Sequence, residues 1–125
     1  MNREIKFRAW INYDGFHGEM INGCQAWGEN HIDWNANDEL SPTHESTILM
    51  QYTGLKDKNG VEIYEGDIIP NKTHGNLIVE YDDNSAAFYL WKDKQNLLGF
   101  PIHFSAKSEL EVIGNIYENP ELLKQ

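Results

Sequence analysis

Short stretches in which apolar and polar residues alternate run through much of this chain. Near its start, every second residue from 5 to 11 is apolar. A period of two is typical of a strand with one buried face. Further stretches rich in β-branched and aromatic residues predict more strands. These stretches are residues 19–22, 32–34, 47–53, 61–64, 68–69, 76–81, 86–92, 97–104 and 109–117.

Turn-forming residues separate the predicted strands. Residues 82–85, all Asp, Asn or Ser, form a turn by composition between the two clearest strands. Asn59 and Gly60 favour positive φ, which suits a type I′ hairpin, and a longer loop closed by Gly60 fits nearly as well. We expect Pro70 to end its strand or to place it at a sheet edge, and Pro101 to demote or split the next strand.

The end of the chain predicts a short helical turn, because Asn119 can cap it and Pro120 suits its first position. Many short strands at regular spacing favour an antiparallel barrel or sandwich, and a barrel removes exposed sheet edges. We therefore predict a mainly β fold, a small antiparallel barrel that is SH3-like or related. Residues 1–125 would form one domain, with an irregular acidic insert at about 14–46 and a barrel-like core at about 47–118.

Composition fits a folded protein of a reducing compartment. The 125 residues are 40% apolar, which suits one domain with its own core. The single cysteine, Cys24, excludes an internal disulfide. The first residues lack the apolar segment of a signal peptide, and no apolar run reaches the roughly 20 residues that span a bilayer. The expected location is therefore the cytoplasm, away from membranes.

The formal net charge of −10 disfavours general binding to nucleic acid. No lysine or arginine lies between Arg8 and Lys56, whereas seven carboxylates do. A solvated acidic surface is the simplest interpretation, and a docking face for a basic partner or a mimic of DNA are the alternatives. Direct binding to nucleic acid would depend on the few basic residues, Arg3, Lys6, Arg8, Lys56 and Lys58.

Candidate chemistry is sparse. The chain has neither a phosphate-binding glycine loop nor a nucleophile elbow, so we predict no catalytic residue and no cofactor. Imidazole and carboxylate groups can bind zinc, but the spacing of the histidines matches no compact metal motif. Loop histidines are the simpler interpretation, and the weak metal candidates are His17, Glu19, His31 and Asp33.

Other residues suggest structural or contact roles. Gly66 is interpreted as a bulge or positive-φ position, and Asp67 as an acceptor of hydrogen bonds that hold the start of the next strand. Asn59 and Gly60 have the turn role described above. Trp27 and Trp34, in a loop-like context, are the aromatic residues best suited to contact a partner.

Three blocks of sequence together resemble one protein family. They are residues 3–10 (REIKFRAW), residues 50–60 continuing through 63–69 (MQYTGLKDKNG, IYEGDII), and residues 112–120 (VIGNIYENP). In their order along the chain and in their amino-acid sequence, these blocks resemble the YopX family of bacteriophage and prophage proteins. The resemblance implies a mainly β protein of phages, prophages and related mobile elements. It implies no catalytic role, so no functional residue is transferred.

The expected function is that of a phage or prophage accessory protein in the cytoplasm of the bacterial host. It would be a non-catalytic β module that binds a protein partner or forms homo-oligomers. Two alternatives remain open. One is a nucleic-acid-directed role, by direct binding or by acidic mimicry of DNA, and the other is a metal-dependent enzyme.

Overall fold

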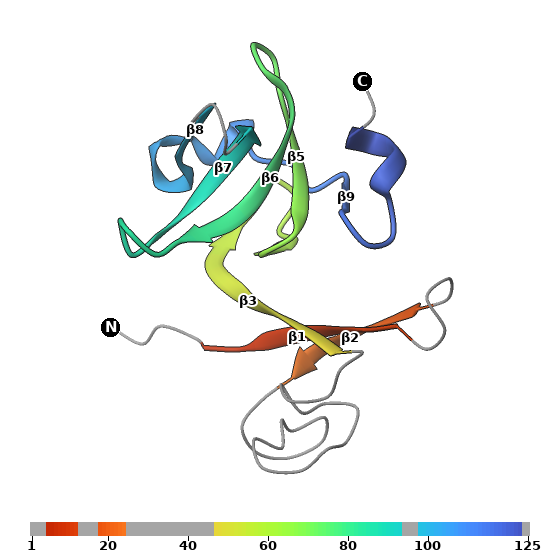
Figure 1. The fold of residues 1–125 in the computed structure, drawn as a ribbon. Coiled ribbons are helices and arrows are strands. Elements are labelled where there is room, and N and C mark those ends of the chain that lie inside the picture. The colour runs from red at the N-terminus through yellow and green to blue at the C-terminus, as the bar shows by residue number, and fades with distance from the viewer. Residues whose placement is uncertain (1–4, 13–17, 25–46, 94–97, 124–125) are drawn as a thin grey trace. The chain divides into compact units, whose positions relative to one another are not determined.

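The fold was obtained as a computed structural model, which describes residues 5–12, 18–24, 47–93 and 98–123. The chain is mainly β, as predicted, and its sheets are antiparallel (Figure 1). The elements are β1 (Phe7–Asn12), β2 (Gly18–Cys24), β3 (Thr47–Lys56), β4 (Glu62–Tyr64), β5 (Asp67–Asn71), β6 (Gly75–Asp82), β7 (Ala87–Asp93), β8 (Leu98–Pro101), the 3₁₀ helices η1 (Ile102–Phe104) and η2 (Lys107–Glu109), β9 (Gly114–Asn115) and the 3₁₀ helix η3 (Pro120–Leu123).

Two sheets contain these strands. The strand order is β2-β1-β3-β4 in one and β8-β7-β6-β5-β9 in the other. The chain divides into two compact units between Tyr52 and Thr53, inside β3. The first part of β3 therefore belongs with β1 and β2, and its last residues belong with β4 to β9. The predicted strand at 32–34 lies outside the described residues.

In the first unit, β1 pairs with both β2 and β3. The period of two holds from Ala9 to Asn12, where Ala9 and Ile11 are buried and Trp10 is only partly buried, but it breaks at the start of the strand, where Arg8 is buried as well. Ala9 packs with Phe7, Ile21 and Leu49. The predicted strands at 5–11 and 19–22 thus correspond to β1 and β2.

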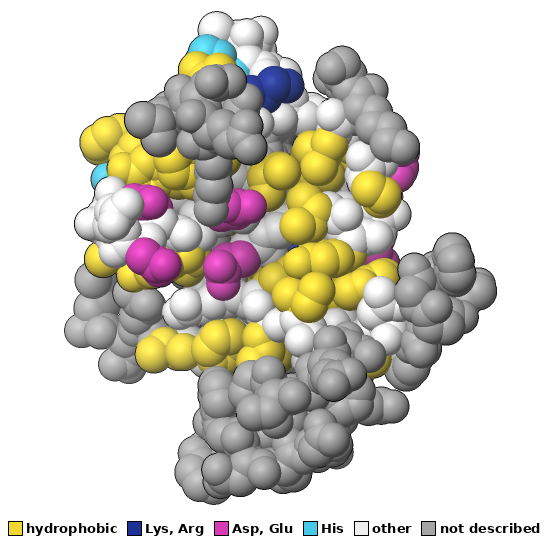
Figure 2. All heavy atoms as spheres, in the orientation of Figure 1, with side chains coloured by type: hydrophobic (Ala, Val, Ile, Leu, Met, Phe, Trp, Pro, Cys, Tyr) yellow, Lys and Arg dark blue, Asp and Glu magenta, His cyan; other side chains and the backbone are white. Residues whose placement is uncertain are grey.

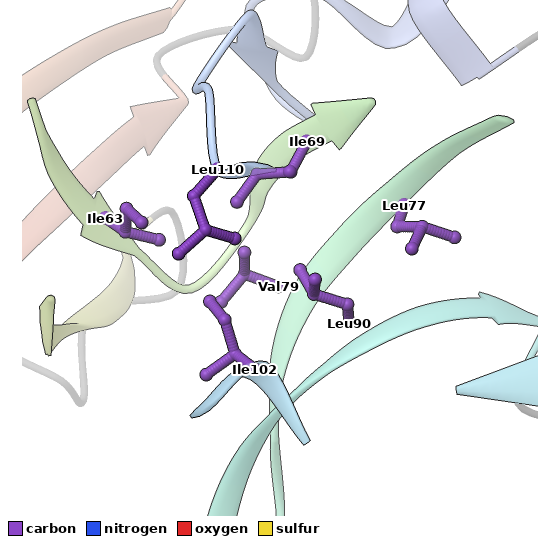
Figure 3. Close-up of a cluster of buried hydrophobic side chains, with 7 residues drawn as sticks. All are labelled: Ile63, Ile69, Leu77, Val79, Leu90, Ile102 and Leu110. Atoms are coloured by element: carbon purple, nitrogen blue, oxygen red, sulfur yellow. The ribbon is translucent and has the colours of Figure 1, made fainter. Parts of the chain in front are cut away.

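In the second unit, one apolar cluster lies against the curled five-stranded sheet (Figures 1 and 3). β6 and β7 form the clearest pair in the sequence, and they are paired in register from Ile78 opposite Trp91 to Asp82 opposite Ala87. Their inward residues join side chains from β4, β5, η1 and the segment after η2. The buried members are Ile63, Ile69, Leu77, Val79, Leu90, Ile102 and Leu110.

The loop between β3 and β4 differs from a type I′ turn. Such a turn needs positive φ at both central residues, but only Gly60, at φ +81°, has it among the described residues of this loop. Gly60 N–H donates to the Asp57 carbonyl oxygen at 3.0 Å, and Asp57 N–H donates to the Val61 carbonyl oxygen at 2.8 Å. This is the longer alternative, a three-residue loop in which a left-handed glycine follows a turn.

The predicted strand over residues 109–117 is wrong for most of its length. η2 occupies its start, and strand pairing is limited to Gly114–Asn115. The intervening backbone bonds to three separate partners instead of one neighbouring strand. Leu110 carbonyl oxygen accepts from Lys58 N–H at 2.9 Å, Val112 N–H donates to the Asp57 carboxylate, and Ile113 N–H donates to Ile68 carbonyl oxygen at 3.0 Å.

The prediction for Pro70 is wrong, because β5 continues through Pro70 to Asn71 and lies between β6 and β9 in the sheet order. The proline is tolerated there because β9 pairs with β5 only at Asp67 and Ile68, so no described strand is paired with Pro70 on that side. Pro101 ends β8, which lies at one end of the sheet order, and η1 follows it directly. The predicted C-terminal helical turn is confirmed as η3, which begins at Pro120.

Candidate functional site

The carboxylate of Asp57 is fully buried and closes the loop between β3 and β4. Its Oδ1 accepts hydrogen bonds from Asn59 N–H at 2.8 Å and from Val61 N–H at 2.9 Å. Its Oδ2 accepts from Val112 N–H at 2.9 Å, across 55 positions of sequence. One side chain therefore shapes its own loop and fastens it to the segment after η2.

Opposing effects act on the pKa of Asp57. Burial raises this pKa, since it penalises the charged form. The backbone hydrogen bonds from Val112, Val61 and Asn59 lower it, and so does the charge of Lys58. The hydrogen bonds and the lysine prevail, so the pKa of Asp57 lies below its ordinary value and the group is ionised near neutral pH.

Gly66 and Asp67 lie at the tight connection from β4 to β5. Gly66 has φ +87°, a backbone conformation that is strained for residues with a Cβ. Its N–H donates to the Val79 carbonyl oxygen at 2.8 Å. Asp67 is 1% exposed, and its Oδ2 accepts from Tyr64 N–H at 2.8 Å. Both residues thus take part in the hydrogen bonding that forms the start of β5.

Asn115 organises the chain between β9 and η3. Its Oδ1 accepts from Tyr117 N–H at 3.1 Å and Glu118 N–H at 2.9 Å, and its Nδ2 donates to Glu118 Oε1 at 2.8 Å. Asn119 Oδ1 in turn accepts from Asn115 N–H at 3.2 Å. A Cβ on Gly114 would lie 2.6 Å from Asn119 Oδ1, so glycine is needed for this close approach.

Asp57, Asp67 and Asn115 therefore all accept hydrogen bonds from backbone N–H groups, and Asn115 also donates to the Glu118 carboxylate. The sequence reasoning did not single out Asp57 or Asn115. A signal for Asp57 existed, because an aspartate two residues before an asparagine–glycine pair favours hydrogen bonds to the following backbone. For Asn115 the sequence carried no comparable turn pattern.

Described residues of the second unit line at least three surface pockets, of which two are wide grooves. The larger, of about 590 Å³, has the last two residues of β5 and the first two of the β5–β6 connection on one side and residues of the η2 region on the other. Its carboxylates already have internal partners. Glu111 forms an ion pair with Lys58 at 3.2 Å, and Glu109 Oε1 accepts from Ala106 N–H at 2.9 Å.

The second groove, of about 330 Å³, lies between the end of β3 and the two short helices. We call it the β3–η1 groove. Its apolar lining comes from the half-buried Leu55 and from Ile102 and Leu110, which also belong to the core. The residues that line it are Gly54, Leu55, Lys56, Ile102, His103, Ser105, Lys107 and Leu110.

Three of the four weak metal candidates lie in segments that the structure does not describe. His17, His31 and Asp33 lie outside the described residues, and Glu19 is an exposed residue of β2 opposite Ile11. Within the described ranges, no group of three or more His, Cys, Asp or Glu side chains is arranged to hold a metal ion. The contact candidates Trp27 and Trp34 also lie outside these ranges.

The basic residues of the sequence analysis have varied surroundings. In the first unit, Lys6 Nζ lies 5.1 Å from the centre of the Tyr52 ring, and Arg8 is buried. In the second unit, Lys58 is paired with Glu111, whereas Lys56 is exposed at the β3–η1 groove. Arg3 lies outside the described residues.

No helix among the described residues is both long enough and apolar enough to cross a bilayer.

Comparison with known proteins places the chain in a family. A solved structure, that of protein EF1440 from Enterococcus faecalis, is 26% identical over 98% of this chain and 99% of its own, with a TM-score of 0.49. No curated protein matches the chain. The family model described as YopX protein matches residues 6–124, nearly the whole length. The resemblance carried by the three sequence blocks is thereby confirmed, and this chain belongs to the YopX family.

Proposed function

We propose that this protein is a non-catalytic accessory protein of a phage or prophage that acts by binding protein in the host cytoplasm, either a partner or a second copy of itself. The observation that carries the proposal is the exposure of large apolar side chains. Phe104, on η1, is 73% exposed. Isolated exposed apolar residues are ordinary, but a phenylalanine so far out of the core is typical of a contact residue.

Other features of the surface agree with a contact role. Figure 2 shows apolar side chains and carboxylates lying among one another on the face turned to the viewer. Interfaces between proteins combine apolar contacts with a polar surround in this way. The buried acids Asp57 and Asp67, which stand in the blocks that carry the family resemblance, are engaged by the backbone. They support folding, which leaves the surface as the part available for function.

Sedimentation velocity of the full chain, fluorescently labelled at its N-terminus, tests this proposal. The labelled chain is measured alone over a wide concentration range and then in extract of a bacterial host. We expect it to sediment faster than a 14.5 kDa monomer in at least one condition. Phe104→Ser should reduce the fast species, and Val61→Ser, at another exposed apolar position, serves as the matched control.

Two outcomes would contradict the proposal. One is sedimentation as a monomer in every condition. The other is loss of the fast species after nuclease treatment of the extract with no effect of protease, which would favour the nucleic-acid-directed alternative.

A further inference from the structure

The β3–η1 groove differs in charge from the chain that contains it. The protein has a net charge of −10. Yet Lys56 and Lys107, both exposed, and His103 line this groove, and none of the described residues that line it carries a carboxylate. By contrast, the larger groove beside it contains Glu109 and Glu111 together with its lysines. The β3–η1 groove is thus a local basic site on an acidic molecule.

The two lysines at this groove have no counter-charge in the part of the chain that the structure describes. Among the described residues, neither Lys56 nor Lys107 forms an ion pair, whereas Lys58 is held by Glu111 at 3.2 Å. An ammonium group without an internal partner remains able to pair with a ligand carboxylate. The charge at this groove is therefore available to an incoming acidic group.

Three of the residues that line the groove are apolar. Leu55 is half-buried, and Ile102 and Leu110 are each 3% exposed with the rest of their side chains in the core. Figure 3 shows Ile102 and Leu110 within the same cluster. Phe104, 73% exposed, is flanked in sequence by His103 and Ser105, both of which line the groove. An occupant would need an apolar group to gain from this lining.

The backbone holds the walls of the groove in place. Ser105 N–H donates to Ile102 carbonyl oxygen at 3.0 Å, and Leu110 N–H donates to Lys107 carbonyl oxygen at 3.1 Å. Lys58 N–H donates to Leu110 carbonyl oxygen at 2.9 Å, which joins the wall after η2 to the loop that follows β3. A groove formed before binding spares its ligand the cost of ordering it.

We propose that the β3–η1 groove binds an acidic peptide segment of a partner protein, with an aliphatic side chain against Leu55 and carboxylates on Lys56 and Lys107. The proposal rests on the proposed function and names the kind of partner. A peptide fits better than nucleic acid, because a phosphodiester chain offers no aliphatic group to an apolar lining.

Fluorescence anisotropy with a synthetic probe tests this proposal on the full chain. The probe is a fluorescein-labelled peptide with one leucine between three acidic residues on each side. We expect saturable binding that weakens as sodium chloride rises from about 50 to about 300 mM, since salt screens exposed charges. Replacing the leucine by serine, or all acids by lysine, should weaken binding about tenfold or more.

Charge-reversal variants test whether the probe binds at the β3–η1 groove. Lys56→Glu and Lys107→Glu should each weaken probe binding about fivefold or more, because attraction becomes repulsion. Lys72→Glu makes the same change of charge at an exposed position in the β5–β6 connection and should alter binding less than about twofold. Circular dichroism on each variant checks that the fold is intact.

Several outcomes would overturn the groove assignment. They are absence of binding, equal binding of the lysine peptide, equal loss in Lys72→Glu and Lys107→Glu, or tighter binding of a single-stranded oligonucleotide of matched charge. If the fast-sedimenting species persists while the probe fails to bind, the groove assignment fails and the proposed function stands.

Discussion

At the scale of single residues, the informative side chains of this protein are the ones that accept backbone hydrogen bonds. Asp57 is the clearest case, because one carboxylate satisfies three N–H groups and connects segments distant in sequence. A buried charge is costly unless its hydrogen bonds are complete. Those bonds keep Asp57 ionised and make it a determinant of stability.

The variant Asp57→Asn should lower the free energy of unfolding by about 2–3 kcal/mol. The amide that replaces the carboxylate is neutral, and its NH₂ group is a donor that cannot accept the backbone hydrogen bond made by the oxygen it replaces. Urea denaturation followed by circular dichroism measures the change. Asp83→Asn, at an exposed turn position, is the control and should have little effect. Equal stability of the two variants would show that the Asp57 hydrogen bonds contribute nothing beyond those to solvent.

The stability contributed by Asp57 should depend on pH. Because its folded pKa is lowered, the contribution is complete above the unfolded value of about 3.9 and is lost as pH falls through the folded pKa. The difference in unfolding free energy between wild type and Asp57→Asn should therefore be constant near neutral pH and shrink below about pH 4. A difference that grows on acidification would contradict the lowered pKa.

Gly60 has a conformational role that can be separated from packing. Its φ is +81°, and a Cβ there would meet no atom within 4 Å. Gly60→Ala should therefore cost about 1–2 kcal/mol of unfolding free energy through backbone strain alone. Gly60→Asn should cost less, because asparagine tolerates the left-handed region. Equal losses in denaturant melts would argue against strain as the cause.

At the scale of elements, each sheet places a glycine beneath a tryptophan of the neighbouring strand. A Cβ on Gly18 of β2 would overlap the Trp10 ring of β1, and a Cβ on Gly99 of β8 would overlap the Trp91 ring of β7. Gly99 lies directly opposite Trp91, whose ring also stacks on Tyr89 with centroids 5.2 Å apart. Each tryptophan ring thus occupies the space that a side chain at the glycine would need.

Gly99→Ala should displace the Trp91 ring and lower the unfolding free energy by about 1–3 kcal/mol, the usual cost of overpacking. The Trp91 indole resonance should shift in a ¹⁵N spectrum. In a Trp91→Leu background the same change should cost clearly less, since the overlapping ring is gone. Identical costs in both backgrounds would mean that the ring does not constrain Gly99.

At the scale of the molecule, the excess of acidic over basic residues opposes compactness. The chain has twenty Asp and Glu residues and ten Lys and Arg residues, so its exposed charges repel one another on average. Salt screens this repulsion. Thermal unfolding followed by calorimetry should show the midpoint rising by a few degrees as sodium chloride goes from about 20 to about 300 mM. The same salt should weaken probe binding at the β3–η1 groove. A midpoint that falls with salt would indicate that net attraction prevails.

The fold class was accessible from the sequence because strand formation is a local matter. Alternation of side chains and β-branched residues mark β1, β6 and β7, and they need no knowledge of the partner strand. The segment at 109–117 shows where this fails. Its alternation is real, yet most of its backbone bonds to a side chain and to loops distant in sequence.

By itself, the sequence determined the mainly β character, the turn glycines, the net charge and membership of the YopX family. Only the tertiary structure decided that Asp57 is buried and bonded to Val112, that Trp91 covers Gly99, and that Lys56 and Lys107, which pair with no described carboxylate, line one groove with Leu55. The reason is physical. Periodicity and turn chemistry depend on neighbours in the chain, whereas burial, hydrogen-bond partners and grooves depend on which distant segments the folded chain brings together.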